Sequence, residues 1–148
     1  MSAEANAERG QLCTFSVAGR YLGVPVARVQ EVIRHQEMTP VPLAPAIVRG
    51  LINLRGQIVT ALDLRVPLML PPAPAGALPM NVVVRAGGDL VSLLVDEIGD
   101  VLEVNAETFE PPPETLGGPA RELIRGAFKL DGRLLLILDT DKMLAQPV

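Results

Sequence analysis

An internal repeat constrains the fold of this 148-residue sequence more than any other feature. The segment IVRGLINLRGQIVTALDLR at residues 47–65 matches LIRGAFKLDGRLLLILDTD at residues 123–141. Three pairs of identical residues keep a constant separation of 76 positions: Gly50 and Gly126, Gly56 and Gly132, and Asp63 and Asp139. A repeat of this kind predicts one supersecondary unit that occurs twice in the fold.

The repeat continues upstream with a different separation. VPVARVQEVI at residues 24–33 matches LLVDEIGDVL at residues 93–102, 69 positions later, so the second half contains a loop seven residues longer. Each half is too small to form a sturdy domain by itself. Short strands with turn signals at close spacing are typical of small closed barrels. We therefore expect a mainly β fold in which two small barrels share a hydrophobic core.

Glycine and proline signals divide the chain into short elements. We expect a strand pair from Leu12 onward, a helical turn at residues 27–30 followed by a strand, and three hairpins. Short helices are expected at residues 46–50, ending on Gly50, at 122–126 and at 141–144. The expected hairpin turns are Arg55-Gly56, Ala86-Gly87-Gly88-Asp89 and Asp131-Gly132.

The segment LPPAPAGALP at residues 70–79 is predicted to be a linker that packs against nothing. We expect a flexible leader over residues 1–11 and a single domain over residues 12–148. Within it, barrel one is expected at about 15–70 and barrel two at about 80–144, with terminal segments free to cross between the barrels.

Composition excludes several functional classes. The net charge of −4 and the isoelectric point of 5.0 argue against nucleic-acid binding, which needs a basic surface. One cysteine and one histidine allow neither an intramolecular disulfide nor a zinc site built on several thiolates or imidazoles, and no cofactor is expected. The amino-terminal segment is polar and the apolar runs are too short to cross a bilayer, so we expect a cytoplasmic protein that does not insert into membranes.

Two carboxylate groups could be catalytic or structural. Asp96, Glu97 and Asp100 form one group, and Asp139 and Asp141 the other. Metal binding or acid–base chemistry is one interpretation, and it would make the chain a small ligand-binding or carboxylate-based enzymatic barrel. The structural interpretation is favoured.

In that structural interpretation, Asp63 and Asp139 lie at equivalent strand ends, where an aspartate caps the next short helix. The Asp96 group is expected to be a solvated edge. His35 has no nearby nucleophile or orienting acid, so we expect an exposed, inert imidazole. Cys13 has no neighbour that would lower its pKa and is expected to pack as a small apolar residue.

Arg55 is the one polar residue that the repeat leaves unexplained. It lies at a hairpin turn, and the other copy has Asp131 in the comparable place, so the fold does not require a positive charge there. An ordinary surface arginine is one interpretation. A binding residue is the other, because arginine is enriched at interface hot spots.

The sequence resembles the CheW-type chemotaxis coupling proteins. VQEVI, GLINLRG and LLVDEIGDVL occur in this order, and the resemblance covers about Phe15 to Leu144. It implies two small SH3-like five-stranded β-barrels with a hydrophobic core between them and short helices. It also implies a non-catalytic adaptor that connects the cytoplasmic tip of a chemoreceptor to the regulatory domain of the chemotaxis histidine kinase, at membrane-bound receptor arrays.

The resemblance also implies site residues. The receptor-binding positions would be Val29, Glu31, Val32 and Arg55, with Val29 and Val32 on one face of the expected helical turn. The kinase-binding positions would be Ile58, Val59 and Leu134, at the barrel ends. The chain has Thr60-Ala61 where the family usually has a proline after the hydrophobic pair, and its linker is unusually apolar. Both flagellar motility and an accessory chemosensory pathway therefore stay open.

Overall fold

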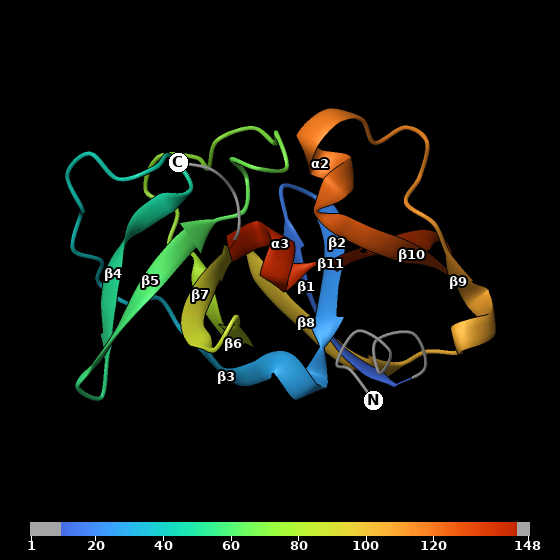
Figure 1. Cartoon of the computed structure of the whole chain (residues 1–148), viewed down its shortest axis with the longest axis horizontal. Coiled ribbons are helices and arrows are strands. Elements are labelled where there is room, and N and C mark those ends of the chain that lie inside the picture. The colour runs from blue at the N-terminus through green and yellow to red at the C-terminus, as the bar shows by residue number, and fades with distance from the viewer. Residues whose placement is uncertain (1–9, 145–148) are drawn as a thin grey trace.

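The computed structural model describes residues 10–144 and shows a mainly β chain built on two sheets (Figure 1). The strands are β1 (Gln11–Val17), β2 (Arg20–Pro25), β3 (Val29–Ile33), β4 (Val48–Leu54), β5 (Gln57–Asp63), β6 (Met80–Ala86), β7 (Asp89–Val95), β8 (Glu97–Glu103), β9 (Phe109–Glu110), β10 (Ile124–Leu130) and β11 (Arg133–Leu138). The helices are the 3₁₀ turns η1 (Val26–Arg28) and η2 (Ala106–Thr108), and the short α-helices α2 (Gly118–Glu122) and α3 (Thr140–Leu144).

The two sheets have the same strand order once the repeat is applied. Barrel one is the sheet β3-β6-β7-β5-β4, and barrel two is β8-β1-β2-β11-β10, extended by the two-residue strand β9. Each strand of one barrel has its repeat equivalent at the same place in the other. The two barrels predicted from the repeat are confirmed, and each takes strands from both halves of the sequence.

The barrels differ from the expected ranges in one respect: a terminal segment crosses between them, as the expectation allowed, but an internal hairpin crosses as well. β5 pairs in parallel with β7, and β11 pairs in parallel with β2. The hairpin β1–β2 therefore belongs to barrel two, and the internal hairpin β6–β7 belongs to barrel one. The chain passes from barrel two to barrel one between β2 and β3, and back to barrel two between β7 and β8. Barrel one is therefore continuous over residues 29–95, whereas barrel two combines β1 and β2 with β8 to β11.

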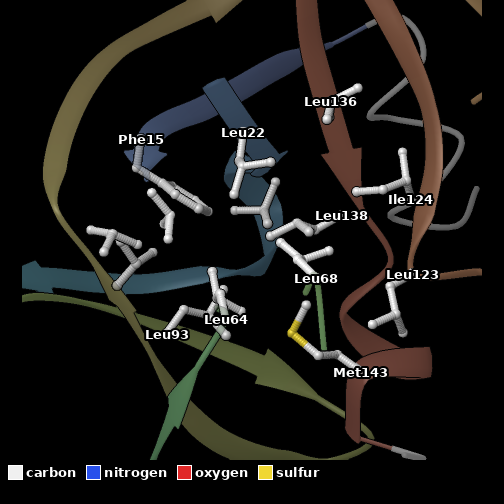
Figure 2. Packing of buried hydrophobic residues seen from close by; sticks show 14 of the residues in the cluster. Phe15, Leu22, Leu64, Leu68, Leu93, Leu123, Ile124, Leu136, Leu138 and Met143 are labelled. Carbon is white, nitrogen blue, oxygen red and sulfur yellow. The ribbon is translucent and has the colours of Figure 1, made fainter. Parts of the chain in front are cut away.

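The largest cluster of buried side chains lies between the two barrels (Figure 2). It includes Phe15, Leu22, Leu64, Leu93 and Met143, which come from both barrels and from α3. A smaller cluster fills the interior of each barrel.

The apolar run of strand β11 is continuous because the strand is buried on both faces. Leu136 and Leu138 contribute to the shared cluster, whereas Leu135 and Ile137 contribute to the interior of barrel two. A strand that is buried on both faces loses the polar alternation of a surface strand.

The repeated glycines Gly50 and Gly126 do not end helices, and the helix expected at 46–50 is wrong. Gly50 lies within β4 and Gly126 within β10, each at a register shift in its hairpin. A Cβ atom on Gly50 would lie 2.8 Å from the carbonyl oxygen of Thr39, and one on Gly126 would collide with the carbonyl oxygen of Glu110. The repeat keeps glycine here because another segment's backbone approaches too closely for a side chain.

The remaining boundaries differ in smaller ways. Helix α2 ends at Glu122, the first residue of the segment 122–126 in which a helix was expected, and α3 begins one residue earlier than expected. Gln11 starts β1, so the leader cannot extend to residue 11, and residues 1–9 lie outside the described part. The linker is exposed at residues 71–78, but Leu70 packs against the shared cluster. No helix within residues 10–144 is long and apolar enough to span a membrane.

Candidate partner-binding surfaces

The expected receptor-binding segment is an edge strand and not a helical turn. The 3₁₀ turn η1 ends at Arg28, and β3 pairs with β6 with a register shift between Val29 and Glu31. Val29 packs against the shared cluster, whereas the side chain of Val32 is 38% exposed. The expectation that Val29 and Val32 share one face is therefore wrong, because strand geometry separates residues that a helix would bring together.

Arg55 and Glu31 are brought together although 24 residues separate them. The Nη2 atom of Arg55 lies 2.7 Å from both carboxylate oxygens of Glu31, and the arginine side chain is 72% exposed. Arg55 belongs to the β4–β5 turn and Glu31 to β3, so the ion pair connects the two ends of the strand order of barrel one.

The β4–β5 turn explains the outward position of the Arg55 side chain. Arg55 and Gly56 both have positive φ angles, of 50° and 88°, as a tight two-residue hairpin turn requires. The side-chain oxygen Oδ1 of Asn53 accepts a hydrogen bond from the Gly56 N–H at 2.8 Å. Three of the four predicted receptor-binding residues, Glu31, Val32 and Arg55, thus present side chains at the surface formed by β3 and this turn.

Two of the three predicted kinase-binding residues occupy equivalent exposed positions. The side chain of Ile58 on β5 is 61% exposed, and that of Leu134 on β11, 76 residues later, is 38% exposed. Val59 is only 1% exposed and belongs to the cluster inside barrel one. The side chain of Val59 is part of the core, so of these two neighbours only Ile58 is exposed for contact with a partner.

Ile58 and Leu134 each line a shallow groove. Groove one has a volume of about 470 Å³ and is lined in part by Ile58, Leu90 and Asp89. Groove two, of about 340 Å³, is lined by residues that include Arg20, Tyr21, Arg133 and Leu134.

The two grooves differ in charge at matching positions. Asp89 in groove one corresponds to Arg20 in groove two, and Gln57 corresponds to Arg133. The guanidinium carbon of Arg133 lies 3.7 Å from the centre of the Tyr21 ring. The two barrel ends therefore present different electrostatic surfaces.

The carboxylates have structural partners. Asp139 Oδ1 accepts a hydrogen bond from the Lys142 N–H at 3.0 Å and so caps α3, as expected. Asp63 Oδ1 accepts one from the Arg65 N–H at 3.0 Å, although turns and no helix follow it.

Asp96 is exposed, as the sequence suggested for its group, but its carboxylate also has two partners. Its Oδ2 atom accepts hydrogen bonds from the Arg65 guanidinium at 2.7 Å and from the Ala18 N–H at 2.8 Å. The side chain of Arg65 is 8% exposed, and its other terminal nitrogen donates to the Pro71 carbonyl oxygen. Sequence analysis did not identify Arg65; an arginine that directly follows a buried strand is the signal that could have done so.

His35 and Cys13 supply no catalytic pair. His35 is half-buried, not exposed as expected, and its Nδ1 atom has no hydrogen-bond partner among the described residues. Cys13 is buried in the shared cluster, and burial raises the pKa of its thiol. Within residues 10–144, no three or more histidine, cysteine, aspartate or glutamate side chains are grouped so that they could hold a metal ion.

Comparisons with known proteins agree with this architecture. The CheW-like domain model matches residues 11–148. The chain is 30% identical to the chemotaxis protein CheW of Klebsiella aerogenes over 131 residues, covering 88% of this chain and 79% of that protein. It is 31% identical to Protein FrzA of Myxococcus xanthus over 120 residues, covering 81% and 73%.

A solved structure shares the fold. The scaffolding protein TtCheW of Thermoanaerobacter tengcongensis superposes with a TM-score of 0.81 and 25% sequence identity, over 90% of each chain. The domain match, the relatives and this structure all cover most of the chain, and they agree with the double-barrel architecture described above. The chain therefore belongs to the CheW family of chemotaxis coupling adaptors.

Proposed function

We propose that this chain connects the cytoplasmic tip of a chemoreceptor to the regulatory domain of a chemotaxis histidine kinase, in the cytoplasm at membrane-bound receptor arrays. The observation that carries the proposal is the surface formed by Glu31, Val32 and Arg55. It combines an exposed apolar residue with a guanidinium on a rigid strand and turn. Such a surface suits a helical hairpin whose carboxylates or helix-end carbonyls accept hydrogen bonds from arginine.

The second partner would bind at the barrel ends. Ile58 and Leu134 are exposed apolar residues at equivalent positions, each beside a shallow groove. A regulatory domain with the same double-barrel fold could contact one end without covering the β3 surface. Simultaneous occupation of both surfaces is what an adaptor requires.

The chain is proposed to act without catalysis. Asp63, Asp96 and Asp139 each use one carboxylate oxygen to accept hydrogen bonds from neighbouring segments of the fold. The raised pKa of Cys13 keeps its buried thiol protonated and unreactive. These features favour the adaptor over a carboxylate-based enzyme.

Kinase activity in a reconstituted system tests the proposal. Vesicles that contain a chemoreceptor are mixed with the kinase and increasing amounts of the protein, and kinase autophosphorylation is measured. We expect stimulation that needs both receptor and adaptor. Equal stimulation on vesicles without receptor, or none on vesicles with receptor, would contradict the proposal.

A further inference from the structure

Two ion pairs occupy equivalent places in the repeat with their charges reversed. Arg65, two residues after Asp63 at the end of β5, pairs with Asp96 at 2.7 Å. Asp141 is the repeat equivalent of Arg65, 76 residues later, and it pairs with Arg28. Asp96 has its repeat equivalent 69 residues earlier, at the position next to Arg28. The acidic and basic residues have therefore changed places between the two halves, while an ion pair between matching parts of the repeat is kept.

The Arg28–Asp141 pair joins the two barrels. Arg28 ends η1, where the chain passes from β2 of barrel two to β3 of barrel one. Asp141 lies in α3, which follows β11 of barrel two. The contact is bidentate: Nη1 lies 3.1 Å from Oδ1, and Nη2 lies 3.0 Å from Oδ2. Bidentate arginine–carboxylate pairs fix orientation as well as distance.

Arg28 also holds the start of the receptor-binding strand. Its Nη1 atom donates to the carbonyl oxygen of Arg85 on β6 at 3.3 Å, so the guanidinium lies between α3 and barrel one. β3 is an edge strand with β6 as its one ladder neighbour in the sheet order. The register shift between Val29 and Glu31 locally disrupts the ladder, so fewer backbone hydrogen bonds fix the start of β3.

We propose that Arg28 and Asp141 are positioning residues, which set where β3 begins relative to barrel two and so fix the receptor surface against the kinase surface. The inference rests on the proposed function in placing receptor binding at β3. The side chain of Arg28 is 19% exposed and already engaged, so it acts through β3 and not by touching the receptor. Asp141 follows β11 of barrel two in the chain, and β11 contains Leu134.

Hydrogen–deuterium exchange tests the positioning without any partner. Asp141→Asn and Arg28→Gln should each increase exchange of the β3 amides at least about threefold, while exchange of β8, the repeat equivalent, stays unchanged. The control Lys129→Gln removes a more exposed ion pair, with Glu110 at 3.7 Å, and should change neither strand. Unchanged β3 exchange in both ion-pair variants would overturn the inference, even if the wild type binds receptor.

Binding measurements then separate positioning from general stability. Each ion-pair variant should weaken binding of a receptor cytoplasmic fragment about five- to tenfold and change binding of the kinase regulatory domain less than twofold. The double variant should bind receptor no more weakly than the worse single variant, because both remove one interaction. An equal loss of both partners, in step with a lower melting temperature, would mean a structural role only and overturn the inference. If the wild type binds no receptor fragment, the proposed function fails, and the exchange result still decides whether the pair positions β3.

Discussion

At the scale of single residues, Arg55 shows how a charge can be exposed and still have a partner. Its guanidinium contacts Glu31, yet most of its side chain is accessible. Exposed ion pairs of this kind contribute about 0–1 kcal/mol to stability because water screens them and both side chains lose entropy. Arg55 is therefore available to exchange its intramolecular partner for one on a receptor.

We expect Arg55→Ala to abolish most receptor-dependent kinase stimulation while the melting temperature changes little. Arg55→Lys should restore stimulation only in part, because lysine lacks the planar fork of donors. The matched control is Arg49→Ala, which removes another exposed arginine of the same hairpin, paired with Asp63 at 3.7 Å. Wild-type stimulation by Arg55→Ala at limiting protein concentration would remove Arg55 from the receptor surface.

Val29 and Val32 make a second test on one strand. Val32→Asp should weaken receptor binding about tenfold or more at an unchanged melting temperature, because burying a valine at an interface contributes about 1.5–3 kcal/mol. Val29→Asp should instead lower the melting temperature, because Val29 packs against the shared core. Isothermal titration and circular-dichroism melts check both. The reverse pattern would show that the two side chains are assigned to the wrong roles.

At the scale of elements, the hairpins β4–β5 and β10–β11 are built around glycines that admit a neighbouring backbone. The Thr39 N–H donates to the Leu51 carbonyl oxygen and the Leu51 N–H to that of Thr39, both at 2.9 Å, directly beside Gly50. A side chain at Gly50 would push this segment away.

Gly50→Ala should therefore destabilise the protein by about 1–3 kcal/mol, the usual effect of forcing extra atoms into a packed site. Gly117→Ala is the control, because no atom lies within 4 Å of its added Cβ and its φ is −126°. Urea unfolding measures both free energies. Equal stability of the two variants would contradict the proposed reason for the glycine.

The same elements show what sequence analysis can and cannot predict. Turn glycines and apolar spacing are local signals, so the hairpins and the two barrels were predictable. Gly50 was misinterpreted as a helix end because the segment that approaches it is eleven residues away. The Asp96 partner Arg65 is 31 residues away, and the exposure of Val32 depends on the pairing of β3 with β6. Contacts between distant segments leave no mark in a local pattern.

At the scale of the whole molecule, exchange of hairpins makes two barrels into one unit. The core lies between them, and the chain crosses between the barrels at η1 and again at Asp96. One unit can hold the proposed receptor surface on barrel one and the apolar barrel end at Leu134 in a fixed relation.

The barrel ends should be needed for kinase binding and dispensable for receptor binding. The kinase regulatory domain is expected to occupy the barrel end at Leu134 or the one at Ile58. Leu134→Asp or Ile58→Asp, whichever lies at the occupied end, should weaken binding of this domain about tenfold, because a charge replaces an exposed apolar contact. Thr108→Asp, an exposed change on η2 away from both grooves, is the control. Full kinase-domain binding by the double variant Ile58→Asp/Leu134→Asp would place the kinase contact elsewhere.

Sedimentation of the kinase with receptor-containing vesicles, as the adaptor concentration rises, tests whether the chain bridges two partners. If it does, the amount of sedimented kinase should rise to a maximum and then fall, because excess adaptor occupies receptor and kinase separately. Arg55→Ala should flatten the curve at every concentration. A curve that is the same on vesicles without receptor, or kinase that sediments fully without the adaptor, would contradict bridging.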